Sequence, residues 1–400
     1  MNEVFIYDAI RSARTKAKAD GGLAALSPME LVASLLNTLK ERTHLDPNLV
    51  EDVTLGCVTQ AVDQAANIAK TSLMVAGWPD HVPGITVNRF CSSGLDACNI
   101  AAMKVIAGQA ELTIGGGVEM MSRVPMLSDK ATAFHDQSFA IKNRFLLMGA
   151  GADFIATRFH CSREDVDQIA LLSQTRAAAA QALGYYASLV PVHNPHTGQT
   201  VDFDECVRGS TTADSLAGLP PAFEQLGAAG SDALQISEHP QYAEIRHVHT
   251  AGNSPAMCDG AAVVLIGSQT AGEQLGIAPR ARIVQTQTTC DDPLEVVGGC
   301  VKAVETLLDK LGLTVGDIDL FEVHEAFAAT SIKLEQRLGL KRGEYNVNGG
   351  CIALGHPMGA TGAMMLGTLL DELERRDLKT GIVATSGAAG TGTAMLIERC

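Results

Sequence analysis

The sequence predicts an α/β fold, and two observations support this prediction. Short apolar runs typical of strands alternate along the chain with longer alanine-rich runs typical of helices. The 400 residues include 39 glycines and only 4% aromatic residues, a composition that suits close packing of helices on sheets. A chain of this length forms two or three domains, or one large α/β unit with an insertion.

Six segments show the alternation most clearly. Residues 28–42 place leucine and valine at helical spacing, and the small-residue run 94–106 ends before a glycine. The first apolar stretch is interrupted by Asp8, which favours a strand over a signal peptide. The predicted strands are 4–10, 113–115 and 381–385, and the predicted helices are 28–42, 94–106 and 359–375.

Two parts of the chain invite comparison as an internal repeat. One runs from Val87-Asn88 through a turn and a helix to glycines 115–117, and the other runs from Val347-Asn348 to Ser386-Gly387. Few identities are shared, so the residues alone leave duplication open. The segment between them, residues 122–250, holds 10 of the 17 aromatic residues and seven of the 11 histidines. We expect it to form an inserted layer that contacts substrate, or else an ordinary surface excursion.

Charge and composition exclude several classes of protein. The net charge of −15 gives no electrostatic support for nucleic-acid binding. No apolar run approaches the roughly 18–20 residues of a membrane span. The ten cysteines include no Cys-x-x-Cys pair, and several lie within apolar runs. This pattern favours a cytoplasmic protein with mostly buried free thiols.

Cys91 is the first candidate for chemistry. It lies where an extended run meets the predicted start of a helix, within Asn88-Arg89-Phe90-Cys91-Ser92-Ser93-Gly94. Free backbone N–H groups and the helix dipole at such a position stabilise a thiolate, and a strand-to-helix turn exposes a nucleophile. The alternative is a buried structural cysteine.

Two histidines are further candidates. His356 lies in a glycine-rich turn before a predicted helix, where an imidazole can serve as base for a thiol, although it could also be a loop histidine without a partner. His324-Glu325-Ala326-Phe327-Ala328 begins like a zinc-protease motif but lacks its second histidine. His247, His249, His193 and His196 have no companions at metal-binding spacing. We therefore expect no metal site.

Four motifs together resemble those of the thiolase family. Cys91 to Gly117 and on through Val118-Glu119-Met120-Met121-Ser122 resembles the acyl-enzyme signature, and Asn348-Gly349-Gly350 through Gly355-His356-Pro357 to Gly362 resembles the second signature. His324-Glu325-Ala326-Phe327 resembles the Asn/His-Glu-Ala-Phe motif, and residues 250–262 also fit. The matches follow the family order and span nearly the whole chain.

The resemblance implies a thiolase-like fold: a duplicated βαβαβαββ core in five α-β-α-β-α layers, with an inserted loop domain. The implied boundaries are 1–121 for the first half, 122–250 for the insertion, 251–270 for the return to the first half and 271–400 for the second half. The implied assembly is a homodimer or homotetramer, with a hydratase or dehydrogenase as a possible partner. The implied activity is acyl-CoA C-acyl transfer in fatty-acid or related degradation, with coenzyme A as substrate and no permanently bound cofactor.

The resemblance also implies roles for individual residues. Cys91 is the acylated nucleophile, His356 takes its proton and helps to hold the thioester oxygen, and His324 stands where many relatives have an asparagine that fixes an oxyanion-hole water. The backbone N–H groups of Cys91 and Ala388 line the acyl oxyanion hole. Ser254 and Met148 join Ala388 as expected coenzyme A contacts.

One departure from the family pattern concerns proton transfer. Ser386 stands where the family has a cysteine that exchanges the proton at the substrate α-carbon, and a hydroxyl is a far weaker acid and base than a thiol. Cys351, close to His356 in sequence, could substitute. Pro255 replaces a usual serine, and no basic pair precedes Pro220 to meet a coenzyme A phosphate. Two alternative functions stay open: an acyltransferase or hydrolase with an altered second half-reaction, and a weakly catalytic coenzyme A-binding partner of a multienzyme complex.

Overall fold

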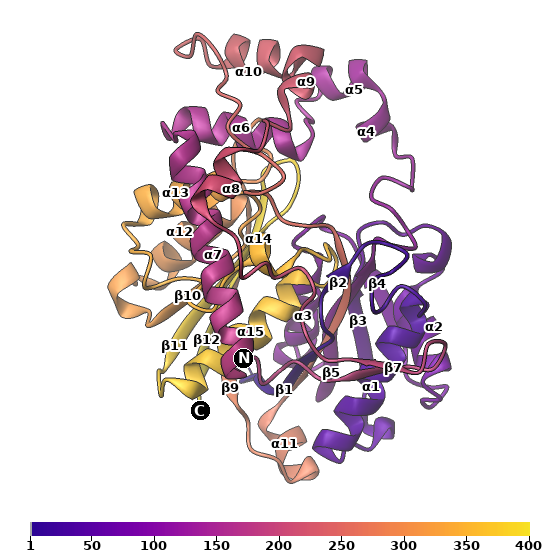
Figure 1. Cartoon of the computed structure of the whole chain (residues 1–400). Coiled ribbons are helices and arrows are strands. Elements are labelled where there is room, and N and C mark those ends of the chain that lie inside the picture. Colours follow the sequence, from indigo (N-terminus) through magenta and orange to yellow (C-terminus); the bar gives the residue numbers. More distant parts are fainter. Residues whose placement is uncertain (1) are drawn as a thin grey trace.

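The computed structural model describes residues 2–400, which are organised around one sheet of ten strands (Figure 1). The strands of this sheet are β1 (Phe5–Arg11), β2 (Thr15–Lys16), β3 (Asp52–Gly56), β4 (Gly84–Val87), β5 (Leu112–Met120), β8 (Cys258–Gly267), β9 (Ala281–Cys290), β10 (Leu320–Val323), β11 (Thr380–Ser386) and β12 (Thr391–Arg399). A separate hairpin pairs β6 (Val192–Asn194) with β7 (Gln199–Val201).

The strand order shows that the core is duplicated. The first half runs β4-β3-β5-β8-β1, and the second runs β10-β11-β12-β9. The two halves share one pairing pattern: β3–β5 and β10–β11 are parallel, and the pairs that follow them towards the middle of the sheet, β5–β8 and β11–β12, are antiparallel. A parallel bridge from Phe321 to Tyr345 stands where the first half has β4. The halves meet at β1 and β9, so the sheet is continuous across them.

The helices account for the remaining layers. They are α1 (Pro28–Thr43), α2 (Ile68–Val75), α3 (Ser93–Ile106), α4 (Thr132–His135), α5 (Gln137–Lys142), α6 (Met148–Arg158), α7 (Arg163–Leu183), α8 (Ala213–Ala217), α9 (Glu224–Leu226), α10 (Asp232–Glu238), α11 (Gln269–Leu275), α12 (Gly299–Leu311), α13 (Ala328–Leu338), α14 (Cys351–Leu354) and α15 (Thr361–Arg375). Single helical turns are η1 (Pro47–Leu49), η2 (Val62–Gln64), η3 (Gly227–Ser231) and η4 (Val315–Asp317). Among residues 2–400 no helix has both the length and the apolar character needed to cross a membrane.

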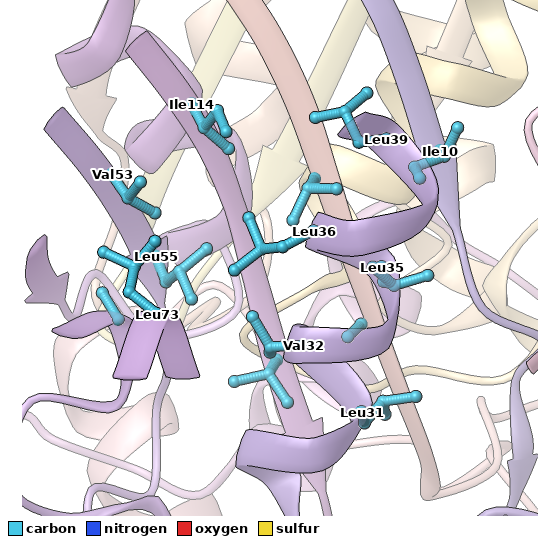
Figure 2. Close-up of a cluster of buried hydrophobic side chains, with 14 of the residues drawn as sticks. Ile10, Leu31, Val32, Leu35, Leu36, Leu39, Val53, Leu55, Leu73 and Ile114 are labelled. Carbon is cyan, nitrogen blue, oxygen red and sulfur yellow. The ribbon is translucent and has the colours of Figure 1, made fainter. Parts of the chain in front are cut away.

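Side-chain alternation along the strands divides the core into layers. On β8, Ala261, Val263 and Leu265 pack with α1 and α2, whereas the intervening residues pack with α3 and α15. Figure 2 shows the same layer, where Leu31, Val32, Leu35, Leu36 and Leu39 of α1 lie over the sheet near Ile10 and Ile114. On β12, Met395 packs with α15 and Leu396 packs with α12. The two halves of the continuous sheet therefore lie on either side of α3 and α15, so the layers are helix, half-sheet, helix, half-sheet and helix, as expected.

The predicted elements agree with the structure, although strand ends differ. The helix predicted at 28–42 is α1, which begins with a capping box between Ser27 and Glu30. The strand predicted at 113–115 is the nine-residue β5, because the glycines that suggested its end continue the strand. Eight of the ten cysteines are buried, and Cys290 and Cys400 are exposed.

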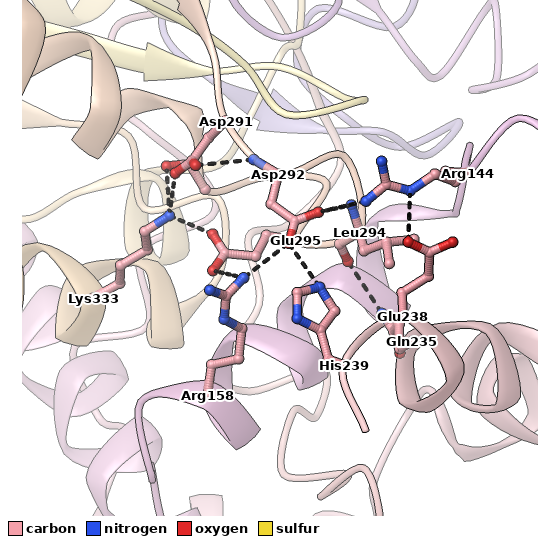
Figure 3. A network of polar contacts seen from close by, with 11 residues as sticks. Arg144, Arg158, Gln235, Glu238, His239, Asp291, Asp292, Leu294, Glu295 and Lys333 are labelled. Atoms are coloured by element: carbon pink, nitrogen blue, oxygen red, sulfur yellow. Dashed lines mark hydrogen bonds and ion pairs between the residues drawn. The ribbon is translucent and has the colours of Figure 1, made fainter. Parts of the chain in front are cut away.

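The segment between β5 and β8 contains α4 to α10 and the β6–β7 hairpin, and much of it lies at the top of the view in Figure 1. The predicted boundaries of the inserted domain, 122–250, stay a prediction. Buried charges join this segment to the second half (Figure 3): Arg158 of α6 pairs with Glu295 at 3.0 Å, and Glu295 also pairs with Lys333 of α13. Lys333 contacts Asp291 at 2.7 Å as well.

Lys333→Ala tests how much this buried network stabilises the fold. The change leaves the Glu295 carboxylate, whose side chain is 2% exposed, without its closest cation. Losing one partner of a buried pair costs about 3–5 kcal/mol of unfolding free energy. Arg337→Ala on the same helix breaks an exposed pair with Glu305 and should cost no more than about 1 kcal/mol. Urea unfolding measures both, and equal losses would contradict the prediction.

Candidate active site

Cys91 lies in a tight turn between β4 and α3, as the sequence predicts. Phe90 has a positive φ of 49°, a conformation that its neighbours support with hydrogen bonds. Asn88 Oδ1 accepts from Phe90 N at 2.8 Å, and Ser93 Oγ accepts from Arg89 N at 2.8 Å. These bonds hold the turn and place Cys91 two residues before the helix.

The surroundings of Cys91 favour a protonated thiol in the resting protein. Burial, and then the buried Glu119 carboxyl, raise the pKa of Cys91 to about 12 against the opposing effect of the residue's own backbone N–H. A thiol with this pKa is almost entirely protonated at neutral pH, so it needs a base to become a nucleophile.

His356 presents such a base. Its Nδ1 lies 2.7 Å from Thr361 Oγ1, and the Thr361 hydroxyl donates to the Pro357 carbonyl at 3.0 Å. Because that hydroxyl hydrogen is used, His356 Nδ1 carries the proton and donates to Thr361. Nε2 is then unprotonated, and it is buried without a hydrogen-bond partner in the described chain. Burial first, then His324 and Arg14, lower the pKa of His356 well below its usual value, so the ring is neutral.

His324 lies beside His356, with the two ring centroids 4.4 Å apart. Its Nδ1 donates to the Ser386 carbonyl at 3.2 Å, because a carbonyl can only accept. Its Nε2 is likewise buried and unpartnered within residues 2–400. Burial lowers the pKa of His324 to about 4. The site therefore contains two neutral imidazoles, and each has an unprotonated Nε2 without a hydrogen-bond partner among the described residues.

A largely apolar cavity of about 330 Å³ contains these groups. Cys91, His324 and His356 all line it. Its apolar walls are Met121, Met126, Leu127, Leu147, Met148, Pro255, Ala256, Phe223, Leu226, Met257, Val297, Ala326, Phe327 and Met358. A smaller pocket of about 30 Å³ adjoins it at Cys91 and includes Phe90, Asp129 and Ala388. This combination of an apolar cavity, a nucleophile and a base is typical of an enzyme site.

The structure places the other predicted site residues as follows. Met148 and Ser254 line the larger cavity, and Ala388 lines the smaller pocket. Ser386 is buried, and its Oγ accepts from Cys300 N at 2.9 Å. Ser386 is not among the described residues that line either pocket. Cys351 is also buried, yet it lies against the two histidines.

The sequence motifs contain Glu119 and Thr361 but gave neither residue a role. Glu119 is fully buried, and its carboxylate accepts from the backbone N–H groups of Val58, Thr59 and Gly359 at 2.9–3.1 Å. It thereby ties the loop that follows His356 to the half that carries Cys91. A carboxylate inside an otherwise apolar strand was the available signal, whereas the contact between Thr361 and His356 needed the structure.

His247 and His249, predicted as loop residues, have a shared partner that the sequence did not reveal. Asp153 of α6 contacts His249 Nδ1 at 2.7 Å and His247 Nδ1 at 2.8 Å. Hydrogen bonds to Asp153 and Asp232 raise the pKa of His247, against an opposing effect of burial. This cluster binds the residues just before β8 to α6. None of its members is among the described residues that line the larger cavity.

The fold and the paired motifs agree with comparisons to known proteins. Residues 4–270 match the model of the thiolase N-terminal domain, and residues 277–399 match that of the thiolase C-terminal domain. The chain is 36% identical over 408 residues to a 3-ketoacyl-CoA thiolase of Cronobacter sakazakii, with 100% of both chains covered. It is 35% identical over 421 residues to a β-ketoadipyl-CoA thiolase of Pseudomonas putida, again with 100% of both covered.

A solved structure gives the same result. The crystal structure of the Bacillus anthracis acetyl-CoA acetyltransferase superposes with a TM-score of 0.85 at 33% identity, covering 100% of this chain and 99% of that one. The duplicated core and the cavity that contains Cys91 and His356 therefore define a class of acyl-transfer proteins built from two similar halves. The chain belongs to the thiolase family.

His356→Ala tests the thiol–base pair through alkylation of Cys91 by iodoacetamide. Without the base, the reaction depends on the thiolate fraction of a thiol whose pKa is about 12. The rate should fall at least about tenfold at pH 7 and then rise about tenfold per pH unit, because the thiolate fraction does so below the pKa. Peptide mass spectrometry of Cys91 after timed quenching gives the rates. Unchanged kinetics at pH 7 would exclude the pairing.

Proposed function

We propose that this protein is an acyl-CoA C-acyltransferase, a 3-ketoacyl-CoA thiolase or acetyl-CoA acetyltransferase that works through acyl-Cys91. The observation that carries the proposal is that a protonated Cys91 thiol and the bare Nε2 of a neutral His356 line one apolar cavity. Such an arrangement suits deprotonation at the moment of attack and excludes water that would hydrolyse a thioester.

In the proposed first half-reaction, His356 Nε2 takes the proton from Cys91 Sγ. The thiolate attacks the 3-keto carbon, and the bond between C2 and C3 then breaks. The leaving carbanion of acetyl-CoA takes a proton at its α-carbon, and Cys91 keeps the shortened acyl group as a thioester. In the second half-reaction the thiolate of coenzyme A attacks that thioester, releases the shortened acyl-CoA and regenerates Cys91.

His324 has a specific part in this scheme. Because its Nδ1–H is bound to the Ser386 carbonyl, its Nε2 can only accept a hydrogen bond. A water molecule held there gives one hydrogen to Nε2 and keeps the other for the substrate oxygen. Once His356 Nε2 is protonated it becomes a second donor. The two histidines then stabilise the negative charge that develops on the reacting carbonyl.

The cavity also favours one class of acyl group. The lining residues of both pockets include no lysine or arginine, and their single carboxylate is Asp129. If the acyl chain ended in a carboxylate, that group would lose its hydration on entering the cavity without gaining a cationic partner. The Asp129 carboxylate would also repel it. We therefore propose that the substrates are apolar 3-ketoacyl-CoAs, in contrast to the dicarboxylic acyl chain in the name of the Pseudomonas relative.

A pair of substrates of equal length tests this proposal. 3-Ketohexanoyl-CoA and 3-ketoadipyl-CoA differ only in whether the chain ends in a methyl group or a carboxylate. We expect kcat/KM for thiolysis to be at least about tenfold higher for the methyl-ended chain, which corresponds to about 1.4 kcal/mol. Intact-mass analysis without coenzyme A should show a butanoyl group retained on the protein.

Two variants act as controls. Cys91→Ala should retain no acyl group while keeping its thermal stability, and acylation of that variant would overturn the assignment of the nucleophile. Asp129→Asn should raise kcat/KM for 3-ketoadipyl-CoA more than for 3-ketohexanoyl-CoA. Equal kcat/KM for both substrates in the native protein would overturn the proposed substrate class. It would not contradict acyl transfer through Cys91.

The leaving carbanion needs a proton donor near its α-carbon. Ser386 occupies the family position, but its hydroxyl is bound to Cys300 N. This placement keeps an alternative open, in which Cys91 is acylated normally and the second half-reaction is altered, as in a hydrolase. Comparing acetoacetyl-CoA thiolysis with thioester hydrolysis separates the two functions.

Ser386→Cys tests whether the missing thiol limits turnover. A thiol accepts hydrogen bonds less well than a hydroxyl, so it is held less firmly by Cys300 N–H and is freer to turn towards the cavity. General acid–base steps contribute about 10²–10⁴-fold. We expect the change to raise single-turnover thiolysis several-fold with little effect on acyl loading. Equal thiolysis rates would show that another group already carries the proton.

The biological setting is proposed on the family resemblance. We propose a cytoplasmic enzyme of β-oxidation or related acyl-CoA degradation, active as a homodimer or homotetramer, with a hydratase or dehydrogenase as possible partner. Coenzyme A enters as substrate, and no permanently bound cofactor is proposed. The alternative of a weakly catalytic coenzyme A-binding partner predicts tight coenzyme A binding without turnover.

A further inference from the structure

Three potential metal ligands meet beside the cavity: His324 and His356 line it, and the buried Cys351 lies close to both. His324 follows β10, Cys351 begins α14 and His356 follows that helix, so three separate positions of the chain supply them. One ligand atom of each residue lies within 4.8 Å of the other two. Cys351 is 2% exposed, and His324 is 1% exposed. Their approach places a soft sulfur ligand beside two imidazoles.

The hydrogen bonds of the two histidines leave both Nε2 atoms free to bind a metal ion. Each Nδ1 is occupied, by the Ser386 carbonyl for His324 and by Thr361 Oγ1 for His356. Each Nε2 is buried without a partner among the described residues. An imidazole that donates through one nitrogen to a carbonyl or hydroxyl and offers the other is the usual form of a metal-bound histidine.

We propose that His324, His356 and Cys351 bind a divalent cation of the Zn²⁺ class, which enters from the cavity and keeps its fourth coordination position open. Two nitrogens and one thiolate form a ligand set suited to Zn²⁺ and poorly suited to Mg²⁺ or Ca²⁺. Zinc bonds of about 2.0–2.3 Å place tetrahedral ligand atoms roughly 3.3–3.8 Å apart. The 4.8 Å limit on the ligand-atom distances in this structure exceeds that spacing by about 1.0–1.5 Å.

The charges around the site are mixed. The Arg14 guanidinium is buried and acts on all three ligand residues, which opposes a cation. The buried carboxyl groups of Glu322 and Glu325 act on Cys351 in the opposite sense. Coordination releases the Cys351 proton to solvent, and the resulting thiolate cancels one of the two positive charges of the ion.

Zinc at this position has a functional consequence. It occupies the Nε2 lone pair of His356 that takes the Cys91 proton, so the loaded protein cannot activate its nucleophile. This inhibitory consequence rests on the proposed function, whereas the binding site itself does not. Measuring binding without any substrate therefore keeps the failure of one proposal separate from the failure of the other.

Cobalt serves as a spectroscopic probe for the site. Metal-free protein is titrated with Co²⁺, and the near-ultraviolet charge-transfer absorption of a Co²⁺–thiolate bond is recorded. We expect one Co²⁺ per chain with this absorption, and we expect Zn²⁺ to abolish it by competition. Cys351→Ala should remove the absorption and weaken Zn²⁺ binding at least about tenfold. Cys98→Ala, which removes another fully buried thiol, should change neither.

His324→Asn gives an independent test if Cys351→Ala fails to fold, as judged by thermal unfolding. It should keep some thiolate absorption while weakening Zn²⁺ binding at least about tenfold. Native protein without the thiolate absorption would overturn the proposal. So would absorption that persists at native strength in Cys351→Ala, because another thiol, either Cys91 in the cavity or the exposed Cys290 or Cys400, would then be the ligand.

Discussion

The buried carboxylate of Glu119 holds the catalytic geometry together. Three backbone N–H groups donate to it, two from the loop after β3 and one from Gly359, and Gln64 Nε2 donates at 2.7 Å. Gly359 belongs to the second half of the chain, three residues after His356, whereas Glu119 belongs to the first half, which carries Cys91. A buried carboxylate is costly unless its oxygens are fully hydrogen-bonded, so the two halves stabilise the charge only in one relative position.

Close backbone packing enforces the same position. A Cβ atom on Gly117 would lie 1.9 Å from the Gly359 carbonyl oxygen, so no larger residue fits between β5 and the turn before α15. α3 and α15 therefore approach each other closely at glycine and alanine residues. The turns before these helices carry Cys91 and His356, and both turns reach the same cavity. The high glycine content of the sequence reflects this requirement.

The sequence was sufficient for features that depend on local patterns. Helical spacing of leucines predicted α1, and the turn before a small-residue helix predicted the placement of Cys91. The strand order needed the structure, because the repeat shares few identities and is visible only in matching parallel and antiparallel pairs. Contacts between distant residues were equally invisible. No spacing rule links Cys351 to His324, and none shows that the Ser386 hydroxyl is already occupied by Cys300 N–H.

The two histidines show how one constraint produces several chemical properties. Each ring is buried, which disfavours the charged form, and each donates its single proton through Nδ1. The consequence is a pair of fixed tautomers with unshared electron pairs at Nε2. In the proposed mechanism, that electron pair serves His356 as a base for the Cys91 thiol and serves His324 as a hydrogen-bond acceptor for a water molecule. A buried lone pair that is available to a proton is equally available to a Lewis acid. The features that suit the site to acyl transfer therefore also make it a ligand set once Cys351 supplies sulfur beside them.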